Sequence, residues 1–459
     1  MLKLYNALTK TVTEFVPLRP GAVKMYSCGP TVYSYAQIGN MRAYIFMDNL
    51  RRVLKFNGYK ITGVMNITDV GHLVSDDDFG EDKMEKAAKK EKKSPYDIAK
   101  HYTEAFMRDL KALDIDVPEH ITKATEYVGQ MIEFIKILEQ KGYTYKLDDG
   151  VYFDVLKYGK YGVLSPKDFD KAGMARIEEN ANKHHNFDFA LWKFVEPDHI
   201  MKWNSPWGVG CPGWHIECSA MSKDILGDKF DIHTGGVDHL TVHHEDEIAQ
   251  NDAAAGHQVV GRWMHNEFLL TDGGKASKSL GNSYTISQLE DKGYSAMDFK
   301  YFCENTHYRK QINFTFEALN SARVARLNLK KILLEHKNGN EKTAESILKD
   351  YDKQFLDAIN DDLNIPLALG VLWTMLKLPR SKQIHQKVIE FDRVFALNLS
   401  KEEAQKTEEI PEQIIKLAQE RQIARAQKNW AESDRLRDEI AAQGFSVKDT
   451  KEGFEIIKN

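Results

Sequence analysis

Short runs of largely apolar residues alternate with a longer amphipathic pattern in the first part of the chain. Residues Val23–Cys28 and Ile61–Ile67 are typical of buried strands, and apolar residues recur at helical spacing over Ala43–Phe56. A strand, a helix and a second strand in this order form a βαβ unit, in which the two strands run parallel. The pattern therefore predicts an α/β fold built on a doubly wound parallel sheet.

A later group of strand patterns indicates that this sheet is interrupted. Residues 96–141 have a helical pattern throughout, whereas residues 151–164 change to short strands and glycine-containing turns. Strand patterns return between Phe230 and about Leu270, with a helix predicted over His244–Ala255. We interpret the residues between the two groups as an insertion into one sheet.

The rest of the chain is predicted to be mainly helical. Apolar residues at helical spacing over Phe316–Glu335 and Glu345–Ala358 predict a bundle that reaches about Leu399. The polar stretch Ser400–Ile410 is typical of a linker. A small terminal unit follows, with a helix that ends near Gly444, where glycine can supply a left-handed cap.

Length and charge narrow the classes of function. The 459 residues are about three times the usual domain length of roughly 150, so we expect two to four domains. The 63 lysines and arginines against 68 aspartates and glutamates leave a net charge of −5, which excludes a uniformly basic surface. Nucleic acid would have to be bound by local patches. The lysine-rich run Lys83–Lys93 is more typical of a solvated face or loop than of a site.

The number of cysteines and the length of the apolar runs indicate the cellular compartment in which the protein works. Four cysteines, Cys28, Cys211, Cys218 and Cys303, are too few for a disulfide framework, which indicates a reducing environment with free thiols or metal ligation. The first residues contain no signal-peptide core, and no stretch approaches the about eighteen apolar residues of a membrane helix. We therefore expect a soluble, cytoplasmic protein with no membrane partner.

Three segments carry residue types that bind zinc: Cys28 after the first strand, Trp214–Cys218, and His243–Glu247. In a helix, His243 and Glu247 stand at i and i+4, so both side chains lie on one face and can converge on one ion. Two thiolates, an imidazole and a carboxylate form a mixed tetrahedral set that suits Zn²⁺. For each cysteine alone, the alternative is a buried structural thiol.

Two loops have the composition of a nucleotide site. Residues Pro30–Asn40 lead from the first strand into a helix, and a glycine there, Gly39, lets a phosphate approach the helix N-terminus. Downstream, Asp272–Asn282 contains Lys275 and Lys278, which could bring two cations to a triphosphate. For each loop alone, the alternative is an ordinary turn.

These pieces together resemble the cysteinyl-tRNA synthetase family, which belongs to the class I aminoacyl-tRNA synthetases. The resemblance rests on five motifs in one order: Cys-Gly-Pro-Thr-Val-Tyr at 28–33, Asn-Ile-Thr-Asp at 66–69, Pro-Gly-Trp-His-Ile-Glu-Cys-Ser-Ala-Met at 212–221, His-His-Glu-Asp-Glu-Ile-Ala-Gln at 243–250 and Lys-Ala-Ser-Lys-Ser-Leu-Gly-Asn at 275–282. It extends over essentially the whole chain and is far more specific than any single motif.

The resemblance implies a class I Rossmann-type catalytic domain with a connective insertion, followed by an α-helical bundle and a small C-terminal anticodon-binding domain. The expected boundaries are 1–115 and 200–286 for the two catalytic halves, 116–199 for the insertion, 287–320 for a connecting stem-contact segment, 321–400 for the bundle and 411–459 for the anticodon-binding domain.

The resemblance also implies roles for individual residues. The expected ligands of one zinc ion per chain, which binds the substrate thiol as thiolate, are Cys28, Cys218, His243 and Glu247. The residues expected to line the amino-acid pocket are Thr31, Thr68, Trp214 and Asp238. ATP, with Mg²⁺, is expected at Gln37, Gly39, Asn40 and Lys278, and the expected catalytic residues are Lys275, Lys278, Gln37 and Asn40.

Two positions depart from the family pattern. The first nucleotide motif is usually His-Ile-Gly-His, and here Gln37 and Asn40 replace both histidines. Their amides can still donate a hydrogen bond to a phosphate oxygen but cannot carry charge, so the change bears on the rate of adenylation and not on the reaction type. In the second motif Ala276 replaces methionine, a change that we expect to be tolerated.

Zinc gives such an enzyme a physical means of rejecting serine. A plain pocket distinguishes near-isosteric substrates by only about a hundredfold. A thiolate bound to Zn²⁺ is a much better ligand than a serine hydroxyl, which resists deprotonation. Selection can then occur at binding, without an editing domain.

The tail has residues suited to tRNA. Arg421, Arg425 and Lys428 fall at i, i+4 and i+7 and predict a basic stripe on one helix face. The resemblance suggests that Trp430 stacks on an unpaired base, whose edges are read by Asp434 and Arg437. The alternative is a solvated helix with a buried tryptophan.

The predicted function is ATP-dependent ligation of L-cysteine to tRNA(Cys), through a cysteinyl-adenylate, by a monomer. Two alternatives remain. The first is a paralogue that transfers the adenylate to a small amine, which would have little use for the tail at 411–459. The second is a non-catalytic RNA-binding relative, suggested by Gln37 and Asn40.

Overall fold

The structure of the protein is a computed structural model that describes residues 1–71, 83–165, 182–275, 282–401, 411–450 and 453–458. It divides into two units, Met1–Ser400 and Lys401–Asn459. Each unit has a core of its own, and the two are described separately.

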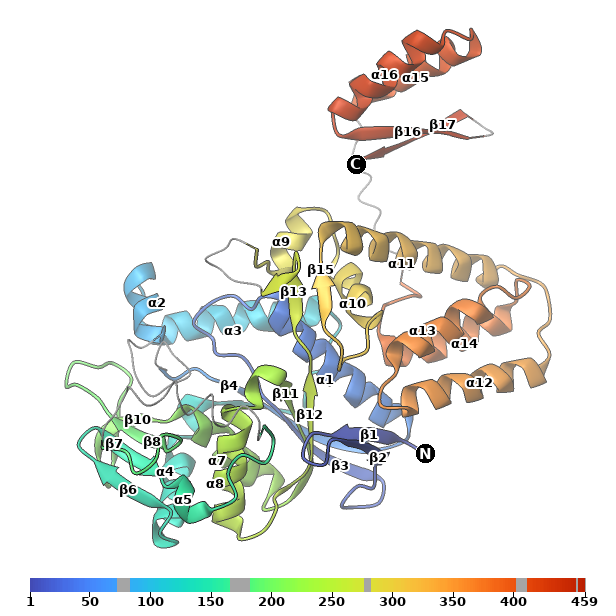
Figure 1. Cartoon of the computed structure of the whole chain (residues 1–459). Coiled ribbons are helices and arrows are strands. Elements are labelled where there is room, and N and C mark those ends of the chain that lie inside the picture. The colour runs from blue at the N-terminus through green and yellow to red at the C-terminus, as the bar shows by residue number, and fades with distance from the viewer. Residues whose placement is uncertain (72–82, 166–181, 276–281, 402–410, 451–452, 459) are drawn as a thin grey trace. The chain divides into compact units, whose positions relative to one another are not determined.

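A five-stranded parallel sheet lies at the centre of the first unit (Figure 1). In spatial order its strands are β12 (Val260–Asn266), β11 (Phe230–Gly236), β3 (Ala22–Ser27), β4 (Lys60–Ile67) and β5 (His120–Lys123). The chain runs outward from β3 to β5 and then returns to the other side of β3 to form β11 and β12. The winding therefore reverses between β3 and β11, and in sheets of this kind ligands bind at the carboxyl ends of the strands beside that point. The predicted α/β class with a parallel sheet is confirmed.

The helix that follows β3 is longer than its apolar pattern suggests. It is α1 (Ile38–Phe56), and it begins directly at the Gln37–Asn40 motif. At its other end Gly58 adopts a φ of 85°, a left-handed conformation that glycine adopts without steric cost. This turn carries the chain into β4, which completes the predicted βαβ unit.

The continuous helical pattern expected over residues 96–141 is wrong. The structure has α3 (Pro95–Ala112), then β5, the short helix η1 (Ala124–Glu126) and α4 (Val128–Gln140). The four residues of β5 are too few to show a period-two pattern, and they become a strand because they pair in parallel with β4.

A second, antiparallel sheet forms the insertion. In spatial order its strands are β6 (Thr144–Leu147), β7 (Gly150–Phe153), β8 (Phe189–Phe194), β10 (Gly208–Pro212) and β9 (Trp203–Ser205). Residues Val155–Tyr158 form the helical turn α5 and not a strand, because the Asp154 side chain accepts a hydrogen bond from the Lys157 backbone N–H and caps the turn.

The chain returns from the insertion to the central sheet through α7 (Trp214–Leu226), and only glycine permits the crossing. A Cβ on Gly213 would lie 2.0 Å from the carbonyl oxygen of Ala190 in β8. The backbone can therefore pass from β10 into α7 close against β8, which puts Trp214 at the first position of the helix.

The remaining elements of the first unit frame this core (Figure 1). They are the hairpin β1 (Lys3–Asn6) and β2 (Thr11–Glu14), the helices α2 (Lys83–Glu91) and α8 (His243–Ala255), the short helix η2 (Val237–His239), the small sheet of β13 (Leu269–Thr271), β14 (Gly274–Lys275) and β15 (Ile312–Phe314), and the helices α9 (Ile286–Asp291), α10 (Ala296–Glu304), α11 (Phe316–Lys337), α12 (Glu345–Asn360), α13 (Ile365–Met375) and α14 (Lys382–Phe395). Phe355 of α12 stacks on Phe391 of α14 at 3.8 Å between ring centroids, inside the bundle predicted from the apolar spacing.

The second unit contains two helices and a hairpin: α15 (Glu412–Ala426), α16 (Trp430–Ala442), β16 (Phe445–Thr450) and β17 (Gly453–Lys458). Its small core contains Ile414, Ala418 and Ile440. Gly444, with a φ of 83°, follows α16, so the predicted helix end is confirmed. Most of the predicted linker, residues 402–410, lies outside the described residues. Within the described parts of both units, no helix has the length and apolar character to cross a membrane.

Candidate metal and nucleotide site

Four candidate metal ligands meet at the point where the winding of the sheet reverses. Cys28 directly follows β3, Cys218 lies in the second turn of α7, and His243 and Glu247 lie in the first two turns of α8. Their ligand atoms all lie within 4.8 Å of one another. Cys28 is half-buried and the other three are buried. The structure therefore brings together residues that are up to 219 positions apart in the sequence.

The distances within this cluster suit convergence on one ion. His243 Nε2 lies 3.1 Å from Glu247 Oε1 and 3.6 Å from Cys218 Sγ. Cys28 Sγ lies 3.8 Å from the same carboxylate oxygen. The chemistry is two sulfur atoms, one nitrogen and one oxygen, a donor set that zinc accepts in tetrahedral coordination.

Sequence reasoning missed two histidines that form an overlapping set of ligands. His233, on β11, and His244 group with Cys28 and Glu247 within the same 4.8 Å limit. His233 Nε2 lies 2.8 Å from Glu247 Oε2, and His244 Nε2 lies 3.2 Å from Cys28 Sγ. Both sets use Cys28 and Glu247, so they describe one centre and not two independent sites. The doubled histidine of the His-His-Glu run was a signal for His244, but nothing in the sequence placed β11 beside α8.

A chain of polar side chains orients His243. Its Nδ1 lies 2.9 Å from Nδ1 of His215, whose Nε2 lies 3.1 Å from a carboxylate oxygen of Asp246. Metal-bound histidines commonly use their second nitrogen in this way, which fixes the ring and leaves Nε2 for the ion. The arrangement therefore favours Nε2 of His243 as the ligand atom.

Burial and neighbouring charges set the protonation states in the centre. Burial would raise the pKa of Glu247, but the His233 and His243 imidazoles lower that pKa to about 2. Burial would also raise the pKa of the Cys218 thiol, and hydrogen bonds from Cys28 and His243 reverse this and lower it. The pKa of Cys28 is raised, first by burial and then by the neighbouring sulfur of Cys218. Burial would lower the pKa of His243, but its hydrogen bonds to Cys218 and Glu247 raise it, so a bound cation would have to displace its proton. An ionised carboxylate and one readily ionised thiol are already in the states that a metal cation requires.

Trp214 and Thr68, expected in the amino-acid pocket, lie beside this centre. The Trp214 ring centroid lies 4.5 Å from that of His243. Thr68 is buried, accepts a hydrogen bond from Asn66 Nδ2 at 3.0 Å and donates one to Glu217 Oε2 at 2.7 Å. Glu217 thus fixes the Thr68 hydroxyl, a contact that the sequence did not indicate.

Thr31 and Asp238, the other two expected pocket residues, lie on the loops after β3 and β11. The backbone of Thr31 pairs with that of Thr68 in an isolated parallel bridge. Asp238 lies in η2, directly after β11, and its side chain is 62% exposed. Its carboxylate is therefore accessible at the carboxyl end of the sheet.

The first nucleotide motif forms the N-terminus of α1. Asn40 Oδ1 accepts a hydrogen bond from the Gln37 backbone N–H at 3.0 Å and so caps the helix. The Gln37 side chain donates to the Tyr35 carbonyl at 3.0 Å and accepts from the Ser283 hydroxyl at 2.5 Å. A Cβ on Gly39 would meet no atom within 4 Å, so the space at the first helical turn is open.

The second nucleotide motif is only partly described. Lys275 ends β14, which pairs with β13. Lys278 and Ala276 lie within residues 276–281, outside the described residues.

In the second unit, the predicted basic stripe is wrong in part. Arg421 is buried, and its guanidinium donates to Asp449 at 2.9 Å, because the hairpin packs against α15. Lys428 follows the end of α15 at Ala426, so it no longer continues the helical spacing. Arg425 remains half-buried, with its guanidinium 5.7 Å from the Trp430 ring centroid.

The Trp430 side chain is exposed, which excludes the alternative of a buried tryptophan. It lies at the first position of α16. Asp434 and Arg437, one and two turns further along α16, pair with each other at 3.0 Å on the exposed surface. The contacts of these three residues with tRNA stay a prediction.

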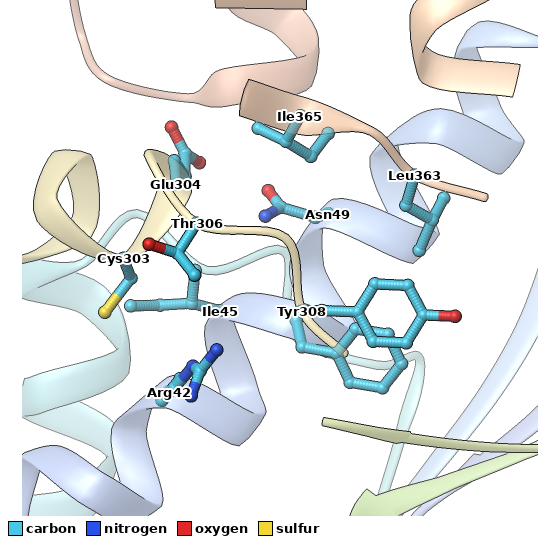
Figure 2. Close-up of a pocket in the computed structure, with 10 residues that line it drawn as sticks. Arg42, Ile45, Asn49, Cys303, Glu304, Thr306, Tyr308, Leu363 and Ile365 are labelled. Carbon is cyan, nitrogen blue, oxygen red and sulfur yellow. The ribbon is translucent and has the colours of Figure 1, made fainter. Parts of the chain in front are cut away.

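A small cavity of about 20 Å³ lies in the first unit, lined by residues of α1, of α10, of the loops that follow α10 and α12, and of the start of α13. Figure 2 shows Asn49, from α1, and Glu304, at the end of α10, lining this space together with Arg42. Both carboxylate oxygens of Glu304 and the amide oxygen of Asn49 are buried without a hydrogen-bond partner. The cavity contains none of the candidate ligands.

Two family models match the chain. The family described as tRNA synthetases class I (C) catalytic domain matches residues 14–324. The family described as Cysteinyl-tRNA ligase anticodon binding domain matches residues 407–456.

Curated relatives are similar over nearly their whole length. The Cysteine–tRNA ligase 1 of Burkholderia lata is 45% identical, and the match covers 98% of this chain and 96% of that protein. The Cysteine–tRNA ligase of Treponema denticola is 41% identical, with 98% of each chain covered.

Solved structures share the fold at low identity. Mycobacterium tuberculosis methionyl-tRNA synthetase in complex with methionyl-adenylate has a TM-score of 0.57 at 13% identity, covering 82% of this chain and 88% of that one. The Agrobacterium radiobacter K84 agnB2 LeuRS–tRNA–LeuAMS ternary complex has a TM-score of 0.60 at 12% identity, with 84% of each chain covered. At such identities the likeness concerns the fold alone.

Proposed function

The chain belongs to the cysteinyl-tRNA ligase family, and from this premise we propose how its own residues carry out the reaction. The protein is an enzyme that joins cysteine to tRNA at the expense of ATP. We propose that the tRNA is tRNA(Cys). The small-amine ligase and the non-catalytic relative are not favoured, because relatives of matching length are tRNA ligases and an anticodon-binding domain matches the tail.

The observation that carries the selection mechanism is the buried cluster of Cys28, Cys218, His243 and Glu247. We propose that these four residues hold one zinc ion per chain. When bound there, zinc supplies a soft Lewis acid that prefers a thiolate sulfur to a hydroxyl oxygen, which is the difference between cysteine and serine. His233 would orient Glu247, and His244 would orient Cys28, through the contacts described above.

Four further residues would form the rest of the amino-acid pocket. Trp214 supplies an aromatic wall beside His243, and Thr68, fixed by Glu217, supplies a hydroxyl. The exposed carboxylate of Asp238 suits the ammonium group of the substrate, and Thr31 borders the pocket from the adjoining loop.

The chemistry needs alignment and charge stabilisation more than covalent help. A carboxylate oxygen of cysteine attacks the α-phosphorus of ATP, and pyrophosphate leaves with the electron pair of the broken P–O bond. A ribose hydroxyl at the 3′ end of the tRNA then attacks the carbonyl carbon of the adenylate, loses its proton, and AMP leaves.

The residues around ATP would act through hydrogen bonds and charge. At the open first turn of α1 we assign the Gly39 backbone N–H to phosphate, with Gln37 and Asn40 beside it. We propose that Lys275 and Lys278, together with Mg²⁺ bound by ATP, stabilise the negative charge that develops on pyrophosphate.

In the tail, we propose that Trp430 stacks on an unpaired anticodon base while Asp434 and Arg437 contact its edges. Arg425, whose guanidinium lies 3.3 Å from Asp449, would contribute positive charge that this carboxylate partly offsets. Arg421 would act indirectly, because it is buried against the same Asp449. Since charged tRNA is used in protein synthesis, we propose that the protein acts in the cytoplasm. We also propose that it is a monomer.

The test compares two cysteine substitutions. The wild-type protein should contain nearly one zinc ion per chain, and Cys218→Ser should lose it, since removing one ligand weakens a tetrahedral site. Cys218→Ser should also lower cysteine-dependent exchange of labelled pyrophosphate into ATP by at least about tenfold. Exchange with serine should gain relative to exchange with cysteine. Cys211→Ser, in β10 and outside the cluster, is the matched control and should retain zinc and activity. Full zinc content and unchanged cysteine selection in Cys218→Ser would contradict the proposal.

A further inference from the structure

The lysine-rich segment around α2 presents an exposed basic face. Met84 and Ala88 are buried toward α3, whereas the lysines point outward. The exposed lysines of this face, which we name the α2 lysine face, are Lys86, Lys89, Lys90, Lys92 and Lys93. The side chain of Lys89 is 70% exposed.

Two glutamates of the same segment, Glu85 and Glu91, each pair with one lysine of this face. Glu85 is 15% exposed, its Oε2 lies 3.9 Å from the Lys89 ammonium, and its Oε1 accepts a hydrogen bond from the Ile200 backbone N–H of the insertion at 3.0 Å. Glu91 accepts a hydrogen bond from the Tyr102 hydroxyl and lies 3.2 Å from the Lys93 ammonium. Among the described residues of this segment, the five exposed lysines still outnumber the two glutamates, so this surface carries an excess of positive charge on a chain whose net charge is −5.

The position of this face relates it to the nucleotide site. His101 of α3 lies 3.0 Å from the hydroxyl of Tyr35, in the loop that precedes α1, and the Tyr35 ring packs edge-on against Tyr102 at 4.9 Å. On its other side, α2 reaches the insertion through Glu85 and Ile200. The α2–α3 pair thus forms one rim of the region where the adenylate would form, and Figure 1 shows α2 at the outer end of α3.

Two exposed aromatic rings accompany the lysines. Tyr96, in the first turn of α3, is 51% exposed, and Tyr35 is 42% exposed. Tyr96 precedes His101 by five residues, which is about 7.5 Å along a helix axis. Lysines interleaved with exposed rings are the surface that binds single-stranded nucleic acid, because the cations follow phosphates and the rings stack on bases.

We propose that the α2 lysine face and Tyr96 bind the unpaired 3′ end of the tRNA acceptor arm as it approaches the adenylate. The inference rests on the proposed function, since the tRNA 3′ end must reach the carbonyl of the adenylate beside the Tyr35 loop. Charge complementarity selects the polyanion, and the exposed Tyr96 ring selects a single strand over a duplex.

The main test neutralises three lysines. The combined variant Lys86→Gln, Lys89→Gln, Lys90→Gln should raise the KM for a tRNA(Cys) transcript about 10- to 100-fold at 0.1 M salt and reduce the slope of log affinity against log salt by about 2, because each contact to a single strand contributes about 0.7. Cysteine-dependent pyrophosphate exchange should stay within about twofold of wild type. The matched control is Lys349→Gln with Lys353→Gln, two exposed lysines of α12, which should change neither quantity.

A second variant tests the single strand. Tyr96→Ala should weaken binding of an acceptor-stem hairpin RNA that carries its unpaired 3′ nucleotides by about 5- to 100-fold, and should leave binding of the same hairpin without them unchanged. If both variants match wild type in tRNA KM and salt slope, the α2 lysine face is merely solvated and the inference is wrong. If wild-type protein itself exchanges pyrophosphate but charges no tRNA, the proposed function fails instead.

Discussion

Two fully buried carboxylates show how the surroundings of a single residue decide its chemistry. Glu247 faces two imidazoles, which hold its pKa near 2 and keep it ionised for a cation. Burial raises the pKa of Glu304 well above its usual value, and the nearby Lys300 only partly opposes this. The same side chain is therefore suited to a metal centre at one position and is a source of instability at the other.

At the residue scale, Glu304→Gln should stabilise the protein. Glutamine has the same shape and cannot ionise, so it removes the cost of protonating Glu304 on folding at pH 7.5, and it supplies an N–H donor near the unpaired oxygen of Asn49. The free energy of unfolding should rise by about 1–3 kcal/mol at pH 7.5, the usual cost of a buried unsatisfied group. Denaturant unfolding measures it.

The sign of the pH effect provides a check on this prediction. Because the folded protein binds the Glu304 proton more tightly than the unfolded chain does, wild-type stability falls as pH rises toward the raised pKa. The advantage of the glutamine variant should therefore grow with pH. Glu345→Gln, at the exposed first position of α12, is the control and should give no stabilisation at any pH. Equal or lower stability of Glu304→Gln at pH 7.5 would refute the argument.

At the scale of an element, the two ends of α8 differ. One end carries two candidate metal ligands, and the other carries a buried carboxylate that lowers stability. Its first two turns carry His243 and Glu247, and acidic residues in the first turn suit the positive end of the helix dipole. Asp252 lies near the opposite end, where a negative charge is unfavourable. Burial raises its pKa to about 6, although the Val259 backbone N–H donates to it at 2.9 Å.

Asp252→Asn should therefore remove a pH-dependent loss of stability. As pH rises from 3.8, the usual value, to about 6, the folded wild type must give up a proton that it holds more tightly than the unfolded chain does. The variant should match wild type near pH 4 and exceed it by about 1–2 kcal/mol at pH 7, allowing for the partial exposure of the side chain. Thermal unfolding across this range tests it, and a constant difference at all pH values would contradict the assignment to Asp252.

At the scale of the whole molecule, chemistry and tRNA reading belong to different units. All four candidate metal ligands and the α1 motif lie in Met1–Ser400, while Trp430 lies in the second unit, which has its own small core. The second unit contributes no residue to the cluster.

A chain that ends at Ser400 should therefore keep its zinc and retain cysteine-dependent pyrophosphate exchange within about threefold of the full chain, because the apolar core of the first unit does not depend on the tail. Charging of tRNA(Cys) should fall at least about a hundredfold, which corresponds to a loss of about 2.8 kcal/mol of binding energy. Trp430→Ala in the full chain should lower charging with exchange unchanged. A truncated chain that charges tRNA normally would show that the second unit is dispensable.

Local sequence patterns were sufficient to predict those features whose residues are close together both in the chain and in space. The βαβ unit, the helices of the bundle, the cap at Gly444 and the i, i+4 pair of His243 and Glu247 all follow from spacing along one element. The motifs also identified the family, because several of them occur in one order over the full length. The roles of individual site residues remain predictions.

Tertiary structure alone decided what depends on pairing between distant segments. The four residues of β5 are a strand because β4 offers its edge, Arg421 is buried because the hairpin folds onto α15, and His233 joins the metal cluster because β11 lies between β3 and β12. The sequence determined the donor atoms and the class of fold. The sheet order brought those donors together, since a contact between residues some two hundred positions apart is set by the packing of whole elements and leaves no periodic trace in the chain.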